Sequence, residues 1–198
     1  MAKKEVIGIF GGSFDPPHLG HLEVGRFVAA KRCMNQVLFM VANNPWQKTV
    51  QGNVTNVSDR YQMVELLLED DVALQPSDLE IQLGGDSSTV RTLERLSAIN
   101  PACDLELVIG YDVAVDIETW IDYERLPELA EIVIIDRPGA LRELPDFLNG
   151  TIRLSGPLID VSSQMIKERI VSGEDINDLV PPKLAEYIYT NSVYASSP

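Results

Sequence analysis

Short apolar runs alternate with longer amphipathic segments along the chain. The runs that contain almost no polar residue are residues 6–10, 37–42, 105–109 and 132–135. Such runs are typical of strands that are buried on both faces of a parallel sheet. One or two weaker strands are expected within residues 72–83, and another at residues 152–154. The pattern therefore predicts a sheet built mainly from parallel strands.

Helical patterns lie between and after these strands. Helices are expected at residues 19–31, from residue 58, at residues 88–98, at residues 163–173 and from residue 181. Ser58 is expected to cap the second helix and Ser87 or Ser88 the third, because a hydroxyl there accepts a hydrogen bond from the first turn. The alternation predicts an α/β fold with a doubly wound, mainly parallel sheet of Rossmann-like type and C-terminal helices. The length favours a single domain over residues 1–198.

Charge and cysteine content restrict the kinds of partner. The chain has 30 acidic and 16 basic residues, and its net charge of -14 disfavours binding to nucleic acid and to anionic membranes. Cys33 and Cys103 form neither a CxxC pair nor a disulfide framework. The apolar run near the N-terminus is too short for a signal peptide, and no apolar stretch reaches the length of a membrane span. A cytoplasmic protein with reduced thiols is expected.

Polar turns follow several of the predicted strands. They are residues 11–21, 43–48, 110–112 and 136–139. Because ligands of doubly wound sheets bind beyond the carboxyl ends of the strands, these turns are the expected site. The segment at residues 43–57 is also long for a loop inside a compact domain, and loops of that length are often functional.

The first of these turns, GGSFDPPHLGHL at residues 11–22, contains both histidines of the chain, His18 and His21. Gly11 and Gly12 allow the backbone to approach a ligand closely, and the following helix directs free N–H groups and its positive dipole end toward the turn. Two imidazoles at i and i+3 share a face if both lie in the first helical turn. This combination predicts an anion site in which the histidines donate hydrogen bonds to phosphate oxygens.

Three other interpretations of this turn remain. The histidines could bind a metal, but a third protein ligand is hard to nominate, so no metal site is expected. They could be surface residues without a role. The turn could also belong to a dinucleotide site, although GGSFDP is not GxGxxG and the two prolines fit that turn poorly.

The histidine turn resembles the signature of the HxGH nucleotidyltransferase superfamily, in the form GG(S/T)FDPxHxGH of bacterial nicotinate-nucleotide adenylyltransferases. Further segments similar to motifs of that family follow in order: NPWQK at 44–48, SDRYQM at 58–63, STVRTL at 88–93, IGYD at 109–112 with Trp120, RPG at 137–139 and VSSQMIK at 161–167. The resemblance runs from about residue 5 to about residue 194. The order and spacing of the segments make it specific.

This resemblance implies transfer of AMP from ATP to nicotinate mononucleotide in NAD biosynthesis, with Mg²⁺ accompanying ATP. It implies catalytic roles at the phosphates for His18, His21 and Lys48. The ATP-binding residues that it implies are Gly11, Gly12, Ser13, Phe14, His18, His21, Gly110, Asp112, Arg137, Ser162, Ser163 and Lys167. The partners expected are these small-molecule substrates, and the family also allows a homo-oligomer.

For the acceptor, the resemblance implies four residues: Asp15, Thr89, Tyr111 and Trp120. Trp120 would stack on the pyridine ring, because an indole offers a flat aromatic face. A core tryptophan is the alternative interpretation. Backbone amides near Thr89 and Tyr111 would receive the nicotinate carboxylate.

The chain departs from the family pattern at five positions: Gln47 stands for histidine, Gln164 for threonine, Lys167 for arginine, Ser88 for tyrosine and Arg91 for aspartate. A lysine is a point charge rather than a bidentate fork, so the contact at residue 167 could be weaker. Two alternatives remain. One is another HxGH transferase with nicotinamide mononucleotide or phosphopantetheine as acceptor, and the other is a nucleotide-binding protein that has lost turnover.

Overall fold

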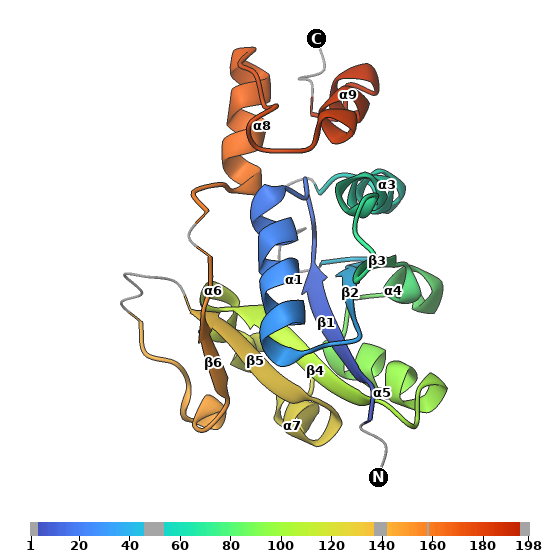
Figure 1. Cartoon of the computed structure of the whole chain (residues 1–198), viewed down its shortest axis with the longest axis vertical. Helices are drawn as coiled ribbons and strands as arrows, with labels where there is room; N and C mark the ends of the chain where they lie inside the picture. Colours follow the sequence, from blue (N-terminus) through green and yellow to red (C-terminus); the bar gives the residue numbers. More distant parts are fainter. Residues whose placement is uncertain (1–3, 46–53, 137–141, 158, 195–198) are drawn as a thin grey trace. The chain divides into compact units, whose positions relative to one another are not determined.

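The computed structural model describes residues 4–45, 54–136, 142–157 and 159–194 (Figure 1). It contains a six-stranded sheet with the strand order β3-β2-β1-β4-β5-β6. The strands are β1 (Val6–Gly12), β2 (Gln36–Val41), β3 (Leu74–Ser77), β4 (Asp104–Gly110), β5 (Glu131–Asp136) and β6 (Ile152–Ser155). This is the order of a doubly wound Rossmann-type sheet, so the predicted fold class is confirmed.

The paired strands β1, β4 and β5 run parallel. Phe10 of β1 pairs with Val108 of β4, and Gly110 of β4 pairs with Ile135 of β5. The carboxyl ends of these strands therefore lie at one edge of the sheet, where Gly11 and Gly110 stand. The apolar runs that predicted the strands are almost fully buried: Ile7, Ile9, Leu107, Val108, Val133 and Ile134. Their burial stabilises the sheet from both faces.

The helices are α1 (Leu19–Arg32), α3 (Val57–Leu68), α4 (Leu79–Leu83), α5 (Thr89–Ile99), α6 (Tyr111–Ala114), α7 (Leu126–Leu129), α8 (Ser163–Ser172) and α9 (Pro182–Thr190). Short 3₁₀ helices are η1 (Ile117–Thr119), η2 (Tyr123–Arg125) and η3 (Asp146–Leu148). The five predicted helices are present. Ser88 caps α5 and Ser162 caps α8, each through its side-chain oxygen.

One local prediction was wrong. The cap of α3 is Asn56 rather than Ser58, because the Asn56 side-chain oxygen accepts the N–H of Asp59 at 2.9 Å. Of the one or two weak strands expected within residues 72–83, the structure has one, β3, and the short helix α4 follows it. The Gln82 side chain donates to both Asp78 oxygens at 2.9 Å, a pairing at i and i+4 that suits a helical turn.

The chain divides into two compact units, and the prediction of one domain over residues 1–198 stays a prediction. The first unit is Met1–Gly11, Val24–Leu38 and Ser88–Leu158, and the second is Gly12–Glu23, Phe39–Ser87 and Ile159–Pro198. In the first unit, Arg32 at the end of α1 donates to both oxygens of Glu106 on β4, at 2.8 and 2.9 Å, and to Glu131 on β5 at 2.7 Å. Glu106 is only 5% exposed, so this bidentate pair replaces the water that its charge would need.

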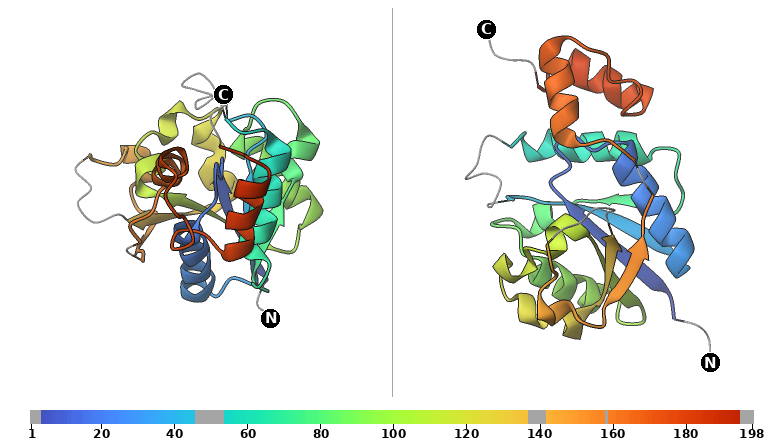
Figure 2. Two further views of the ribbon diagram at one scale, coloured as in Figure 1. Left: turned by 90° about the horizontal axis from the view of Figure 1, so that it is seen from above. Right: turned by 90° about the vertical axis from the view of Figure 1, so that its left-hand side faces the viewer.

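In the second unit, α9 lies beside α3 (Figures 1 and 2). The Tyr187 hydroxyl donates to Asp59 Oδ1 at 2.7 Å, and Lys183 pairs with Glu69 at the end of α3. Six apolar residues of the two helices are almost completely buried: Met63, Val64, Leu67, Leu184, Ala185 and Ile188. The last helix is therefore held by both packing and polar contacts.

Candidate functional site

The two histidines of the predicted anion site lie together at the start of α1. Their ring centroids are 3.8 Å apart. His18 stands just before the helix, and its carbonyl accepts the N–H groups of His21 at 2.9 Å and Leu22 at 3.2 Å. In return, the His18 N–H donates to Nδ1 of His21 at 3.3 Å. The His21 side chain thus takes the place that the glutamate has in a capping box, whereas the bond in the other direction is a backbone hydrogen bond of the turn.

His18 is buried, and its environment keeps it neutral. Its side chain is 7% exposed, and burial lowers its pKa to about 4. Its Nδ1 atom is buried without a hydrogen-bond partner among the described residues. A buried polar atom without a partner is costly, so this nitrogen is a candidate to contact a bound group.

The glycine between the histidines is required by close packing. A Cβ atom on Gly20 would lie 2.9 Å from Val161 Cγ1 and 3.0 Å from His18 Nδ1. Both distances are shorter than ordinary van der Waals contacts, so a side chain there would displace the His18 ring or Val161. The spacing of two histidines around a glycine thus has a steric reason in this fold.

The buried side chain of Phe14 packs against the histidine turn. Phe14 has a φ of 47°, in the left-handed region, and its side chain is 2% exposed. Its ring stacks on Phe39 at a centroid distance of 5.6 Å and meets His21 edge-on at 5.1 Å. The ring also fills the space next to Gly12, where a Cβ would lie 3.0 Å from it. The Phe14 ring therefore supports the His21 ring. The predicted contact between Phe14 and ATP stays a prediction.

The start of α8 is linked to the histidine turn. The Ser163 hydroxyl donates to the Pro16 carbonyl at 2.8 Å, and the Ser162 hydroxyl accepts the Met165 N–H at 3.1 Å. Lys167 Nζ donates to Asp15 Oδ2 at 2.7 Å. The structure thus brings these residues, which sequence patterns placed at the phosphates, next to the turn that carries the histidines.

Asp15 has a different setting from the one expected of an acceptor-binding side chain. It is 7% exposed, and besides Lys167 it accepts the Tyr194 hydroxyl at 2.7 Å and the Thr55 N–H at 3.4 Å. Burial by itself would raise the pKa of Asp15, but the hydrogen bonds from Lys167, Thr55 and Tyr194 hold it below its usual value. The carboxylate is therefore ionised and already engaged with protein groups.

Arg60, for which the sequence predicted no role, holds three segments of the second unit together. Its guanidinium donates to the carbonyls of Ser13 at 2.9 Å, Thr55 at 2.9 Å and Asn43 at 3.1 Å. The side chain is 1% exposed. The segment SDRYQM resembles a motif of the family, but the sequence does not indicate which backbone carbonyls Arg60 contacts.

The first unit carries the residues expected to bind the acceptor and part of ATP. Gly110 ends β4, and Tyr111 and Asp112 begin α6 directly after it. Tyr111 is buried, its hydroxyl donates to the Arg142 carbonyl, and the Arg153 guanidinium lies 6.0 Å from its ring centroid. Asp112 is exposed.

Thr89 and Trp120 also lie in the first unit. Thr89 is the first residue of α5, next to the capping Ser88. Trp120 directly follows η1 as its C-cap, and its backbone N–H donates to the Ile117 carbonyl at 2.9 Å. Both residues are half-buried. Lys48 and Arg137 lie outside the described residues.

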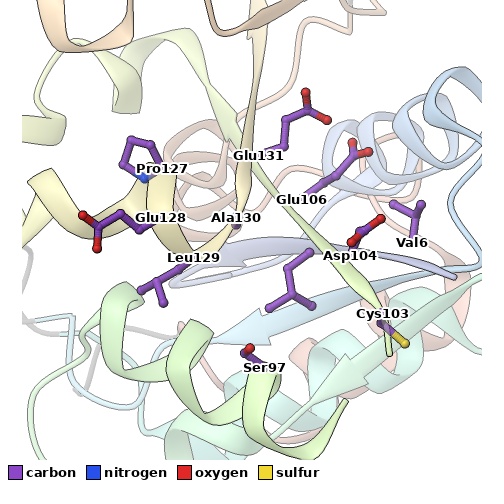
Figure 3. A pocket seen from close by; sticks show the side chains of 11 residues that line it. Val6, Ser97, Cys103, Asp104, Glu106, Pro127, Glu128, Leu129, Ala130 and Glu131 are labelled. Atoms are coloured by element: carbon purple, nitrogen blue, oxygen red, sulfur yellow. The ribbon is translucent and has the colours of Figure 1, made fainter. Parts of the chain in front are cut away.

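A pocket of about 360 Å³ lies elsewhere in the first unit (Figure 3). It is lined at the amino ends of the strands by Val6 of β1, Asp104 of β4 and Glu131 of β5, together with residues of α5 and α7. None of the predicted site residues lines it, and its strand ends are opposite to those that carry Gly11 and Gly110.

Comparison with known proteins identifies the family. The model of the cytidylyltransferase-like family matches residues 9–169. The chain belongs to this family. It is 34% identical to a probable nicotinate-nucleotide adenylyltransferase of Clostridium tetani, covering 98% of this chain and 100% of that protein. It is 36% identical to a protein of the same name in Thermus thermophilus, covering 95% and 98%.

Two solved structures agree with the fold. The nicotinic acid mononucleotide adenylyltransferase of Plasmodium falciparum, complexed with NaAD, has a TM-score of 0.79 at 21% identity and covers 96% of this chain and 97% of its own. A putative nicotinate-nucleotide adenylyltransferase of Vibrio parahaemolyticus has a TM-score of 0.74 at 22% identity, covering 98% and 97%. The match to the family model and the identity to the two curated relatives confirm the family that the motifs indicated. Within the described part of the chain, no helix has the length and apolar character needed to cross a membrane.

Proposed function

We propose that this protein transfers the AMP moiety of ATP to nicotinate mononucleotide and releases pyrophosphate. The observation that carries the proposal is the pair of adjacent imidazoles at the start of α1, in a chain that is similar over nearly its whole length to nicotinate-nucleotide adenylyltransferases. The product would be nicotinate adenine dinucleotide, an intermediate of NAD biosynthesis.

The reaction requires positioning and charge stabilisation more than covalent help from the protein. A phosphate oxygen of nicotinate mononucleotide attacks the α-phosphorus of ATP, and the bond from that phosphorus to the bridging oxygen of pyrophosphate breaks. No protein nucleophile is needed for such an in-line displacement. The neutral His18, together with His21 and the positive end of the α1 dipole, would stabilise negative charge that develops on the phosphates.

The remaining phosphate contacts are proposed from α8 and from two residues outside the described ranges. The first N–H groups of α8, after Ser162 and Ser163, would bind phosphate oxygens. Lys167 would contribute positive charge there, although its ammonium is now paired with Asp15 at 2.7 Å. Lys48 and Arg137 are proposed to add cations on the strength of the motif resemblance alone.

The backbone of the histidine turn would supply further contacts to ATP, at Gly11, Gly12, Ser13 and Phe14. At the end of β4, contacts to ATP are proposed for Gly110 and Asp112. Thr89, Tyr111 and Trp120 are proposed for the nicotinate acceptor. The half-buried state of Trp120 is compatible with stacking on a pyridine ring. Asp15 is better explained as a support of the turn than as an acceptor ligand, because its carboxylate is buried and paired.

Mg²⁺ would accompany ATP and neutralise part of the charge on its phosphates. Over the residues that the structure describes, no group of three or more His, Cys, Asp or Glu side chains could hold a metal ion by itself. The ligands of Mg²⁺ would then come mostly from phosphate oxygens and water, as is common for this ion. A homo-oligomer in the cytoplasm, without nucleic acid or membrane as partner, remains part of the proposal.

The proposed function is tested by incubating the purified protein with Mg²⁺, ATP and one acceptor at a time. Nicotinate mononucleotide should give pyrophosphate and the dinucleotide, with nicotinamide mononucleotide and phosphopantetheine as comparison acceptors. Transfer to phosphopantetheine alone would move the protein to another activity of the superfamily. ATP binding without pyrophosphate from any acceptor would favour a nucleotide-binding protein without turnover.

A further inference from the structure

We propose that Tyr194, which follows the last helix, is a positioning residue for the turn that carries His18 and His21. Its hydroxyl and its ring hold the Asp15 carboxylate and the Lys167 ammonium in one cluster against that turn. The inference rests on the proposed function, because it takes this turn as the phosphate site.

The contacts form a closed triangle. The Tyr194 hydroxyl donates to Asp15 Oδ1 at 2.7 Å, and Lys167 Nζ donates to the other oxygen, Oδ2, at 2.7 Å. Lys167 Nζ also lies 5.1 Å from the centroid of the Tyr194 ring, within the range of a cation–π contact. Each member of the triangle therefore contacts the other two.

The protonation states agree with these directions of donation. Burial raises the pKa of Tyr194, and the nearby Asp15 charge raises it further, so the hydroxyl stays protonated and donates. The pKa of Asp15 is held below its usual value despite burial, so its carboxylate stays ionised and accepts. Arg60 and Lys167 are the cations that act on this carboxylate electrostatically, and the Tyr194 hydroxyl and the Thr55 N–H complete its polar contacts.

A shift of Asp15 would be transmitted to the histidines. Asp15 precedes His18 by three positions, and the two residues between them are Pro16 and Pro17. Proline rings restrict φ, so this short segment has little freedom to absorb a displacement. The Pro16 carbonyl is held in addition by the Ser163 hydroxyl at 2.8 Å. The position of Tyr194 thus influences both the His18 ring and the start of α8.

A tyrosine in the same part of the chain offers a matched control. The Tyr187 hydroxyl on α9 also donates to a carboxylate, Asp59 Oδ1, at 2.7 Å. That carboxylate lies on α3 and belongs to no predicted site residue. Loss of the Tyr187 hydroxyl removes a hydrogen bond of the same kind without touching the histidine turn.

The test compares Tyr194→Phe, Tyr187→Phe and Tyr194→Ala with the unmodified protein in the pyrophosphate assay, alongside thermal unfolding. Tyr194→Phe should lower kcat by about tenfold, because a small displacement of positioned groups is expensive in the transition state. Tyr187→Phe should lower the melting temperature about as much as Tyr194→Phe does, because each variant loses one hydroxyl–carboxylate hydrogen bond. It should leave kcat and both KM values within about twofold of the unmodified protein. Tyr194→Ala should lower kcat further, since the ring that faces Lys167 is also lost.

A kcat unchanged in Tyr194→Phe, or lowered equally in Tyr187→Phe, would overturn the inference, because the hydroxyl would then contribute only to stability. If the unmodified protein transfers AMP to no acceptor, the proposed function fails separately. The affinity for ATP, measured by calorimetry on the same variants, then decides. Weaker ATP binding in Tyr194→Phe but not in Tyr187→Phe supports positioning of the turn, and equal affinities contradict it.

Discussion

The backbone N–H of His18 donates to Nδ1 of His21 while the two imidazole rings lie 3.8 Å apart between centroids. His21 therefore caps the helix that it belongs to through Nδ1, which leaves Nε2 as its other ring nitrogen. His18 contributes the other ring, buried and with an unpartnered Nδ1. The two histidines act as one structural unit, and a change in one alters the setting of the other.

Replacement of either histidine should abolish most of the turnover. His18→Ala and His21→Ala are each expected to lower kcat by at least about 100-fold, the loss typical of a removed donor at a charged transition state. Because the rings support each other, the double variant should lose little more than the worse single variant. The measurement is pyrophosphate release, with circular dichroism to verify folding. Near-normal turnover in both single variants would remove the histidines from the mechanism.

The buried His18 predicts a pH-dependent stability. Its pKa is lowered to about 4 in the folded protein, whereas in the unfolded chain it is expected near 6.5. As the pH falls from 6.5 to 4, the unfolded chain takes up a proton that the folded protein does not. The free energy of unfolding should therefore be fully retained above pH 6.5 and fall by about 3 kcal/mol as the pH decreases to 4.

Urea unfolding of the unmodified protein and of His18→Gln at several pH values in this range measures that effect. The variant lacks the imidazole, so its stability should decrease less steeply than that of the unmodified protein. The carboxylates titrate in both proteins, so their effects on the free energy of unfolding cancel in the comparison. Parallel curves for the two proteins would mean that His18 is charged or solvated in the folded state.

The central strands could be predicted from sequence because they bury nearly every side chain. In β4 and β5, continuous apolar runs leave few other structures open to the segment. Residues 79–83 were harder, since Leu79, Ile81 and Leu83 alternate with polar residues as a half-buried strand does. The cap of α3 was misassigned because Asn56 and Ser58 are both good capping residues, and only the hydrogen bond to Asp59 distinguishes them.

The site was predictable where it depends on local spacing. The histidines and glycines lie within one short turn, so their order in the sequence is close to their order in space. The Asp15 to Lys167 pair joins residues 152 positions apart, and the sequence suggested separate ligands for the two side chains. Arg60 binds backbone carbonyls, which every residue has, so no side-chain pattern could have indicated its partners.

Gly20→Ala should separate stability from activity. Alanine favours a helix by about 1 kcal/mol over glycine, so α1 itself should not be weakened. The new methyl group would collide with Val161 and the His18 ring, and turnover should fall by about tenfold or more through displacement of the ring. The variant Gly20→Ala with Val161→Ala removes one of the two collisions. If this second change restored full activity, the Val161 contact rather than the His18 ring would account for the loss.

Trp120→Ala tests the acceptor assignment. Stacking of an aromatic side chain on a ring is worth about 1–3 kcal/mol, so the KM for nicotinate mononucleotide should rise by roughly tenfold or more. The KM for ATP should change little. A tryptophan that only supports packing around the buried Ile117 would instead lower the melting temperature and affect both substrates alike. Initial rates at varied concentrations of each substrate distinguish the two outcomes.

Arg60 should be among the most sensitive positions for stability. Arg60→Met would keep the apolar part of the side chain but leave the carbonyls of Ser13, Asn43 and Thr55 without their donor. Each buried group that loses its partner costs about 1–3 kcal/mol, so the free energy of unfolding should fall by about 3 kcal/mol or more. Arg60→Lys should recover only part of this loss, because one ammonium cannot reproduce the planar fork that reaches three acceptors.

The control for Arg60 is Arg125→Met, which removes a charged side chain from an exposed pair with Glu94. Exposed ion pairs contribute little to stability, so this variant should unfold at nearly the same urea concentration as the unmodified protein. The histidine turn is anchored through the Ser13 carbonyl, so Arg60→Lys should also show weaker ATP binding than Arg125→Met. A stable Arg60→Met protein with unchanged affinity for ATP would mean that water replaces the guanidinium, and that the three segments hold their positions without it.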